Sequence, residues 1–172
     1  MRALMKIVAA MLLAAGSFGM AAGSAAAQSA PNFTGIDQWF NSAPLSMASL
    51  RGKVVLVNFW TYGCVNCVRT IPHVVRMNAL YKDKGLVVVG VHTPEFPFEK
   101  SATNVQAALK RFGIHYAVAQ DNGSATWNAY GNRYWPAQYV IDKSGRIALT
   151  HFGEGNHEQI EQTIRRLLAP QG

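Results

Sequence analysis

The only two cysteines of the chain, Cys64 and Cys67, lie three positions apart, directly after an apolar run. Two thiols at this spacing can close and reopen a small disulfide ring, but they cannot cross-link distant parts of a fold. The pattern therefore predicts a redox-active dithiol. Structural zinc is the alternative, but it needs two more ligands, and the sequence has no second cysteine pair and no His-x-x-x-His motif. We expect no metal, and no cofactor other than the Cys64-Cys67 disulfide.

A strand and a helix are expected to position these thiols. Residues 54–59 form a continuous, mostly β-branched run, which is typical of a strand buried on both faces. A helix is predicted from about 67 to 82, ending before Gly85, and a second buried strand at 86–91. A βαβ unit of this kind is parallel and right-handed.

The place of the dithiol at the start of a helix gives the two sulfurs different roles. Unpaired backbone N–H groups and the positive end of the helix dipole favour a thiolate over a thiol at the first position. We therefore expect Cys64 to be the nucleophile that attacks a partner's disulfide. Cys67 lies one turn further and is expected to be more buried, so it would resolve the mixed disulfide.

The rest of the chain continues the alternation of helices and strands. A single α/β domain is predicted, a three-layer α/β/α sandwich with a central mixed sheet. Three caps are expected: Ser101 for the helix that ends at about Phe112, Ser124 for a short helix, and Asn156 with Gln159 as a capping box for the last one. The predicted elements are a helix at 101–112, a strand at 116–119, a short helix at 124–130, a strand hairpin at 138–141 and 146–152, and a helix at 156–168.

Residues 1–27 have the three parts of a secretory signal peptide. Arg2 and Lys6 supply a positive start, an apolar stretch follows, and Ala25-Ala26-Ala27 supplies the small residues of a cleavage site. We expect cleavage after Ala27, which leaves residues 28–172 as one domain in an oxidising compartment outside the inner membrane. An uncleaved membrane anchor is the alternative.

The charge of the chain makes one class of partner unlikely. The sequence has 16 Lys and Arg against 9 Asp and Glu, a formal net charge of +7. Two of the basic residues lie in the leader, and the others are scattered without a dense basic stripe. We therefore expect no nucleic-acid binding. A monomer is also expected.

Several motifs together resemble the thioredoxin superfamily. They are Phe59-Trp60, the Cys64/Cys67 pair, Pro72 five residues after the second cysteine, Trp135-Pro136 before a hairpin, and the terminal amphipathic helix. The leader and an αβ insertion are similar to the exported TlpA/ResA-like thiol-disulfide oxidoreductases. The stretches 60–67 and 91–95 look closest to the thioredoxin-like domain of DipZ-type proteins. The similarity covers about residues 33–168.

This resemblance implies further site residues. It implies a cis Trp135-Pro136 peptide bond beside the dithiol, which is chemically reasonable because proline is the residue for which cis costs least. Trp135 would then offer its backbone to an extended partner segment. Gly63 stands where thioredoxins carry a tryptophan, so we expect Tyr62 to fill that wall of the substrate groove. Trp60 is expected to pack beneath the cysteines.

The proton route of Cys67 is where the chain departs from these families. Asn58 stands in place of the buried aspartate of thioredoxins, and Thr70 in place of the glutamate of ResA-like proteins. Neither side chain titrates in the useful range. Parallel strands end at the same edge of a sheet, so the loop after the second strand should emerge beside the dithiol. Our hypothesis is that Glu95, with His92, exchanges the proton; the alternative is that they are a solvated residue and a packing group.

Three functions fit the sequence. The first is an exported thiol-disulfide oxidoreductase that reduces disulfides of exported proteins and is itself reduced by a membrane thiol reductant of the CcdA/DsbD type, as the resemblance implies. The second is a thiol peroxidase: Thr61 stands three residues before Cys64, as in peroxiredoxins, although Val57 occupies the place of their proline. The third is a copper-binding chaperone, for which His92 would be a ligand.

Overall fold

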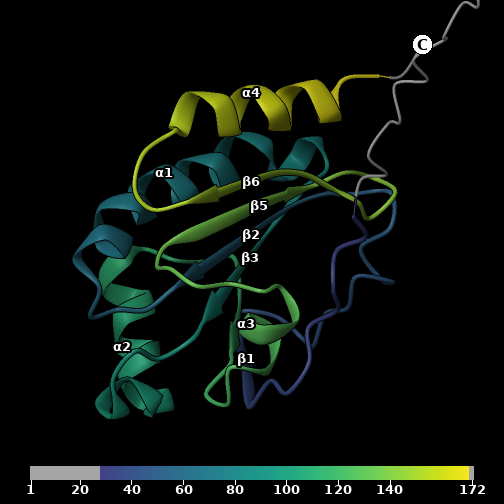
Figure 1. Ribbon diagram of the computed structural model, residues 1–172. Coiled ribbons are helices and arrows are strands. Elements are labelled where there is room, and N and C mark those ends of the chain that lie inside the picture. Colours follow the sequence, from purple (N-terminus) through teal and green to yellow (C-terminus); the bar gives the residue numbers. More distant parts are fainter. Residues whose placement is uncertain (1–27, 171–172) are drawn as a thin grey trace, which may run out of the picture.

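The computed structural model describes residues 28–170 (Figure 1). The expected signal peptide at 1–27 lies outside this range, so its cleavage stays a prediction. Within the described range, no helix is both long and apolar enough to cross a bilayer.

Six strands form one mixed sheet, in agreement with the predicted fold class. The strand order is β1-β4-β3-β2-β5-β6, with β2, β3 and β4 parallel to one another and the other strands antiparallel to their neighbours. The strands are β1 (Gln38–Phe40), β2 (Val54–Trp60), β3 (Leu86–His92), β4 (Ala117–Gln120), β5 (Ala137–Ile141) and β6 (Ile147–Phe152).

Four α-helices connect or follow the strands. They are α1 (Val65–Tyr81), α2 (Ala102–Phe112), α3 (Ala125–Ala129) and α4 (His157–Leu168), with short 3-10 helices at Lys82–Lys84 and Pro97–Lys100. The βαβ unit is β2-α1-β3, and α2 with β4 forms the predicted αβ insertion. Figure 1 shows α1 and α4 lying together over the sheet, where Arg76 of α1 pairs with Glu161 of α4.

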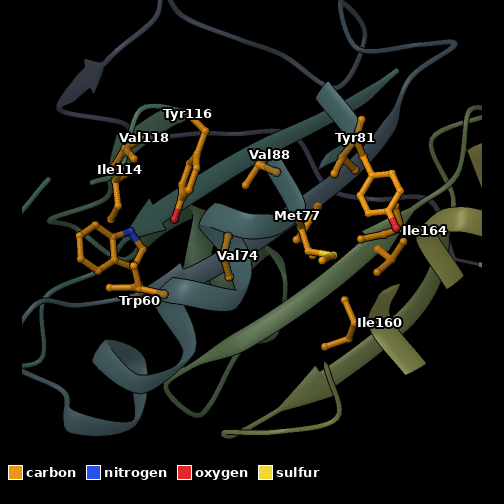
Figure 2. Close-up of a cluster of buried hydrophobic side chains, with 14 of the residues drawn as sticks. Trp60, Val74, Met77, Tyr81, Val88, Ile114, Tyr116, Val118, Ile160 and Ile164 are labelled. Atoms are coloured by element: carbon orange, nitrogen blue, oxygen red, sulfur yellow. The ribbon is translucent and has the colours of Figure 1, made fainter. Parts of the chain in front are cut away.

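Each face of the sheet carries its own apolar core because the side chains of β2 alternate. Leu56 and Trp60 point to the face that α1, α2 and α4 cover, and Val57 and Phe59 point to the other. The first core includes Val74 and Met77 of α1 and Ile160 and Ile164 of α4 (Figure 2). The second is covered by α3 and the segment that precedes β2. Since β2 is fully buried, the strand that leads to the dithiol is held from both sides.

The structure corrects the sequence predictions at several element ends. Strand β1 is absent from the prediction, and α1 begins at Val65, two residues earlier than expected. Ser124 precedes α3, but its side chain caps nothing; the carboxylate of Asp121 instead accepts hydrogen bonds from the N–H groups of Thr126 and Trp127. The capping box at Asn156 is likewise wrong, because its side chain bonds that of Gln159 and not the helix backbone.

Candidate active site

Cys64 is the N-cap residue of α1. Its backbone is extended, with φ −81° and ψ 117°, and its carbonyl accepts the N–H of Val68 at 3.0 Å, the first bond of the helix. The side chain is half-buried, so a reagent in solution can reach the sulfur. The loop from Trp60 to Cys64 therefore delivers one thiol to the surface at the positive end of the α1 dipole.

Cys67 lies one turn into α1 and is buried, with 1% of its surface exposed. Burial raises the pKa of this thiol far above its usual range, and its hydrogen bond to Cys64 acts in the same direction. A backbone hydrogen bond from Thr61 lowers the pKa and offsets part of the effect, while the charge of Glu95 adds a smaller increase. Cys67 is therefore held as a neutral thiol next to Cys64.

Asn58 and Thr70, which the resemblance places where related families carry acids, do not titrate near neutral pH. Asn58 is buried in β2, where it pairs in register with Gln138 of β5. The hydroxyl of Thr70 donates to the carbonyl of Asn66 at 2.9 Å, one turn earlier in α1. Both side chains are in the positions the sequence indicated, so the proton of Cys67 must move through other groups.

His92 ends β3, directly beside the end of β2. The register pairs Trp60 with His92, so the parallel strands do end at one edge of the sheet, as expected. The imidazole is fully buried; its Nε2 lies 3.3 Å from the hydroxyl of Thr61, and Trp60 and Tyr62 pack on the ring at 5.1 and 5.5 Å. Burial lowers the pKa of His92 to about 4, although the charge of Glu99 opposes this. At neutral pH His92 is an uncharged packing group.

Glu95 and Glu99 occupy very different environments. Glu95 is exposed on the loop after β3, and its charge is close enough to affect Cys67. Glu99 has no exposed surface, and its carboxylate accepts three backbone hydrogen bonds. The donors are the N–H groups of Gly63 at 2.9 Å, Glu95 at 2.6 Å and Phe96 at 2.9 Å. The sequence analysis missed Glu99, although it is the carboxylate that contacts the dithiol loop directly.

The Trp135-Pro136 peptide bond is cis, as the resemblance implied. Ala137 pairs with Phe59 across β5 and β2, so Pro136 lies at the sheet edge where β2 ends. The indole of Trp135 is turned inward: its Nε1 donates to the carbonyl of Thr93 at 3.1 Å, and the ring packs on Trp127 at 4.2 Å. These contacts hold the Trp135 indole in place, and the binding of a partner segment by its backbone stays a prediction.

Tyr62 contacts the loop that follows β3. Its hydroxyl donates to the carbonyl of Phe98 at 2.8 Å, and both rings line a surface pocket of about 360 Å³ with Arg111. Phe96 and Phe98 are exposed and stack on each other at 5.6 Å. Phe96 and Phe98 thus extend, beside the dithiol loop, the aromatic wall that was expected from Tyr62. Trp60 packs in the same buried cluster as Cys67, as expected.

The sheet order, the dithiol at the start of α1 and the cis proline before β5 define a thioredoxin-like α/β protein. The Redoxin family model matches residues 25–167, and the chain belongs to this family.

Curated relatives include thiol-disulfide proteins. Protein DipZ of Mycobacterium bovis is 51% identical over 142 residues, which cover 81% of this chain and 20% of DipZ. The thiol-disulfide oxidoreductase ResA of Bacillus thuringiensis is 28% identical, and the match covers 80% of this chain and 76% of ResA. The chain therefore spans about a fifth of the length of its DipZ relative.

Solved structures agree with the fold. A thiol-disulfide isomerase from Corynebacterium glutamicum superposes with a TM-score of 0.74 at 26% identity, and covers 83% of this chain and 98% of its own. A thiol:disulfide interchange protein from Chlorobium tepidum gives a TM-score of 0.69 at 28% identity, with coverages of 83% and 97%. The predicted thioredoxin-like fold is confirmed.

The buried, neutral state of His92 predicts a loss of stability in acid. Its pKa is lowered from 6.5 to about 4, so between these values the unfolded chain binds a proton that the folded chain does not. Its contribution is complete above pH 6.5 and falls as the pH drops toward 4, by up to about 3 kcal/mol. Urea unfolding should show that the free energy of unfolding of the wild type falls by this amount relative to that of His92→Phe between pH 7 and 4. A difference that is constant with pH would contradict the assignment.

Proposed function

We propose that this chain is an exported thiol-disulfide oxidoreductase that reduces disulfides of other exported proteins through Cys64 and Cys67. The observation that carries this proposal is the unequal exposure of the two thiols. Cys64 is half-exposed at the N-terminus of α1, whereas Cys67 is buried against it. The Cys64 sulfur can react with a partner's disulfide, while the buried Cys67 sulfur can react only afterwards, with the mixed disulfide on Cys64. The signal-like leader supports export.

The reaction has two balanced steps. The Cys64 thiolate attacks one sulfur of the partner's disulfide; that bond breaks, a mixed disulfide forms, and the departing partner thiolate takes up a proton. Cys67 then loses its proton and attacks the Cys64 sulfur, which forms the Cys64-Cys67 disulfide and releases the second partner thiolate. The partner gains two electrons and two protons, and this chain is oxidised. A membrane thiol reductant of the CcdA/DsbD type would return the chain to the dithiol.

The other two functions are less well supported. ResA and the two solved structures described above are named as thiol-disulfide proteins. Val57, at the place of the peroxiredoxin proline, is buried in the middle of β2. Both points disfavour a thiol peroxidase. For a copper chaperone, His92 would have to reach a metal beside the sulfurs, but its ring is enclosed by Trp60 and Tyr62, with Nε2 next to Thr61.

Because Cys64 attacks and Cys67 resolves the mixed disulfide, only one of the two cysteine variants should trap a partner covalently. Cys67→Ser leaves Cys64 able to attack but removes the group that resolves the mixed disulfide. This variant should accumulate covalent complexes with exported proteins in cells, visible as bands that disappear on reduction. Cys64→Ser is the matched control and should trap at least tenfold less, because the remaining thiol is buried. Equal trapping by the two variants would refute the assigned roles.

We further propose that Glu95 accepts the proton of Cys67 during the second step. Its carboxylate is exposed, so it can exchange the proton with water, and its charge already acts on Cys67. His92, with a pKa of about 4 and no exposed surface, is a poorer candidate for this exchange. We therefore assign the proton exchange of Cys67 to Glu95 and not to the pair of Glu95 and His92.

The direction of the effect of Glu95→Gln distinguishes a proton acceptor from a passive charge. As a passive charge, Glu95 raises the pKa of Cys67, so its removal would favour the thiolate and speed the second step. As a proton acceptor, its removal should slow that step by about 10²-fold. In a stopped flow, reduced protein mixed with a chromophoric aromatic disulfide releases one thiol when Cys64 attacks and a second when Cys67 resolves the mixed disulfide, and the second release gives the rate. A rate equal to or above that of the wild type would rule out the acceptor role.

A further inference from the structure

Glu99 is a fully buried carboxylate to which neither the fold nor the proposed reaction has yet given a role. It lies in the 3-10 helix Pro97–Lys100, and Lys100 beside it is exposed. A charged side chain is buried only when its hydrogen bonds are satisfied. Here both oxygens are used: Oε1 accepts from Gly63, and Oε2 accepts from Glu95 and Phe96.

These donors belong to two separate loops. Gly63 immediately precedes Cys64 in the loop that follows β2, whereas Glu95 and Phe96 lie in the loop that follows β3. The hydrogen bond from Gly63 joins positions 36 residues apart in the sequence. One side chain therefore ties the backbone that carries the surface thiol to the backbone that carries Glu95.

Gly63 shows that the space between the loops is filled. A Cβ atom built on Gly63 would overlap Oε1 of Glu99, with the ring of Phe98 at 3.8 Å. Any side chain at position 63 would therefore push the carboxylate away from the Gly63 N–H. This close approach gives a local reason for a glycine directly before the first cysteine.

We propose that Glu99 is a positioning residue for Cys64, acting through the Gly63 amide. The inference rests on the proposed function, because it concerns how readily Cys64 and Cys67 form their disulfide. With the loop held, Cys64 stays at the start of α1 beside Cys67. Without the carboxylate, the backbone at 60–64 gains freedom, and the effective concentration of one thiol at the other falls. The disulfide then becomes easier to reduce.

The test is the equilibrium between the purified protein and glutathione redox buffers, followed by alkylation and mass measurement. Glu99→Gln keeps the shape but has only one acceptor oxygen, so it cannot accept from both loops. We expect the equilibrium constant for forming the Cys64-Cys67 disulfide to fall about tenfold, equivalent to a potential about 30 mV less negative. Asp83→Asn is the charge-matched control, since Asp83 is exposed beyond the far end of α1, and it should match the wild type. A Glu99→Gln constant within twofold of the wild type overturns the proposal.

A second pair of variants tests the same contact from the Gly63 side, and Gly63→Ala in the wild-type background keeps the proposal testable if Glu99→Gln folds poorly. Gly63→Ala should lower the same equilibrium constant in the wild-type background, because the methyl group displaces the carboxylate. In a Glu99→Ala background the methyl group has room, so Gly63→Ala should cause no further loss. An equal loss in both backgrounds would mean that Gly63 acts independently of Glu99, which also overturns the proposal.

The same samples separate this inference from the proposed function. If wild-type dithiol reduces insulin disulfides and Glu99→Gln has an unchanged glutathione equilibrium, then only the positioning role fails. If the wild type reduces no protein disulfide although the glutathione equilibrium shifts with Glu99→Gln, then the proposed function fails and the positioning role stands.

Discussion

Strands β2 and β3 run parallel and pair in register up to Trp60 and His92, so the chain leaves the sheet twice at the same edge. After β2 it supplies the loop that ends at Cys64, and after β3 the loop that contains Glu95 and Glu99. Helix α1 makes the crossover between the strands, and its N-terminus falls at this edge because a parallel pair requires it. The dithiol therefore lies close to the two carboxylates because both loops follow the ends of parallel strands.

Burial then decides the state of each group at that edge. It raises the pKa of the Cys67 thiol and lowers that of the His92 imidazole, so both are neutral near pH 7. Glu99 is equally buried, but three backbone N–H groups satisfy its oxygens. Among the two cysteines, His92 and the two glutamates, only Cys64 and Glu95 remain accessible to a partner and to water. The same low-dielectric interior that stabilises the fold therefore separates the attacking sulfur from the resolving one.

Much of this arrangement is predictable from the sequence. The apolar runs of β2 and β3 are continuous, and glycines and Ser101 mark the element ends, so the βαβ unit and the mixed sheet were predicted correctly. Strand β1 was missed because it has three residues and depends on pairing with β4, about 80 residues away. Such a short edge strand has almost no local signal.

Glu99 could not be found in the same way. Its role depends on a contact with Gly63, and nothing in its own neighbourhood distinguishes it from a surface glutamate. Glu95 was a candidate because the loop that follows β3 emerges beside the dithiol; the structure exposes Glu95 and buries the carboxylate four residues later. The one local sign was Gly63, which stands where thioredoxins carry a tryptophan and whose missing side chain leaves room for Glu99.

The two cysteines differ in accessibility, and we propose that they therefore differ in role. Reduced protein treated with a limiting amount of iodoacetamide, then digested and sequenced by tandem mass spectrometry, tests it most directly. Cys64 should be alkylated at least tenfold faster than Cys67, because it is half-exposed at the helix N-terminus while Cys67 is buried and held as a neutral thiol. Equal labelling of the two cysteines, or faster labelling of Cys67, would contradict this account.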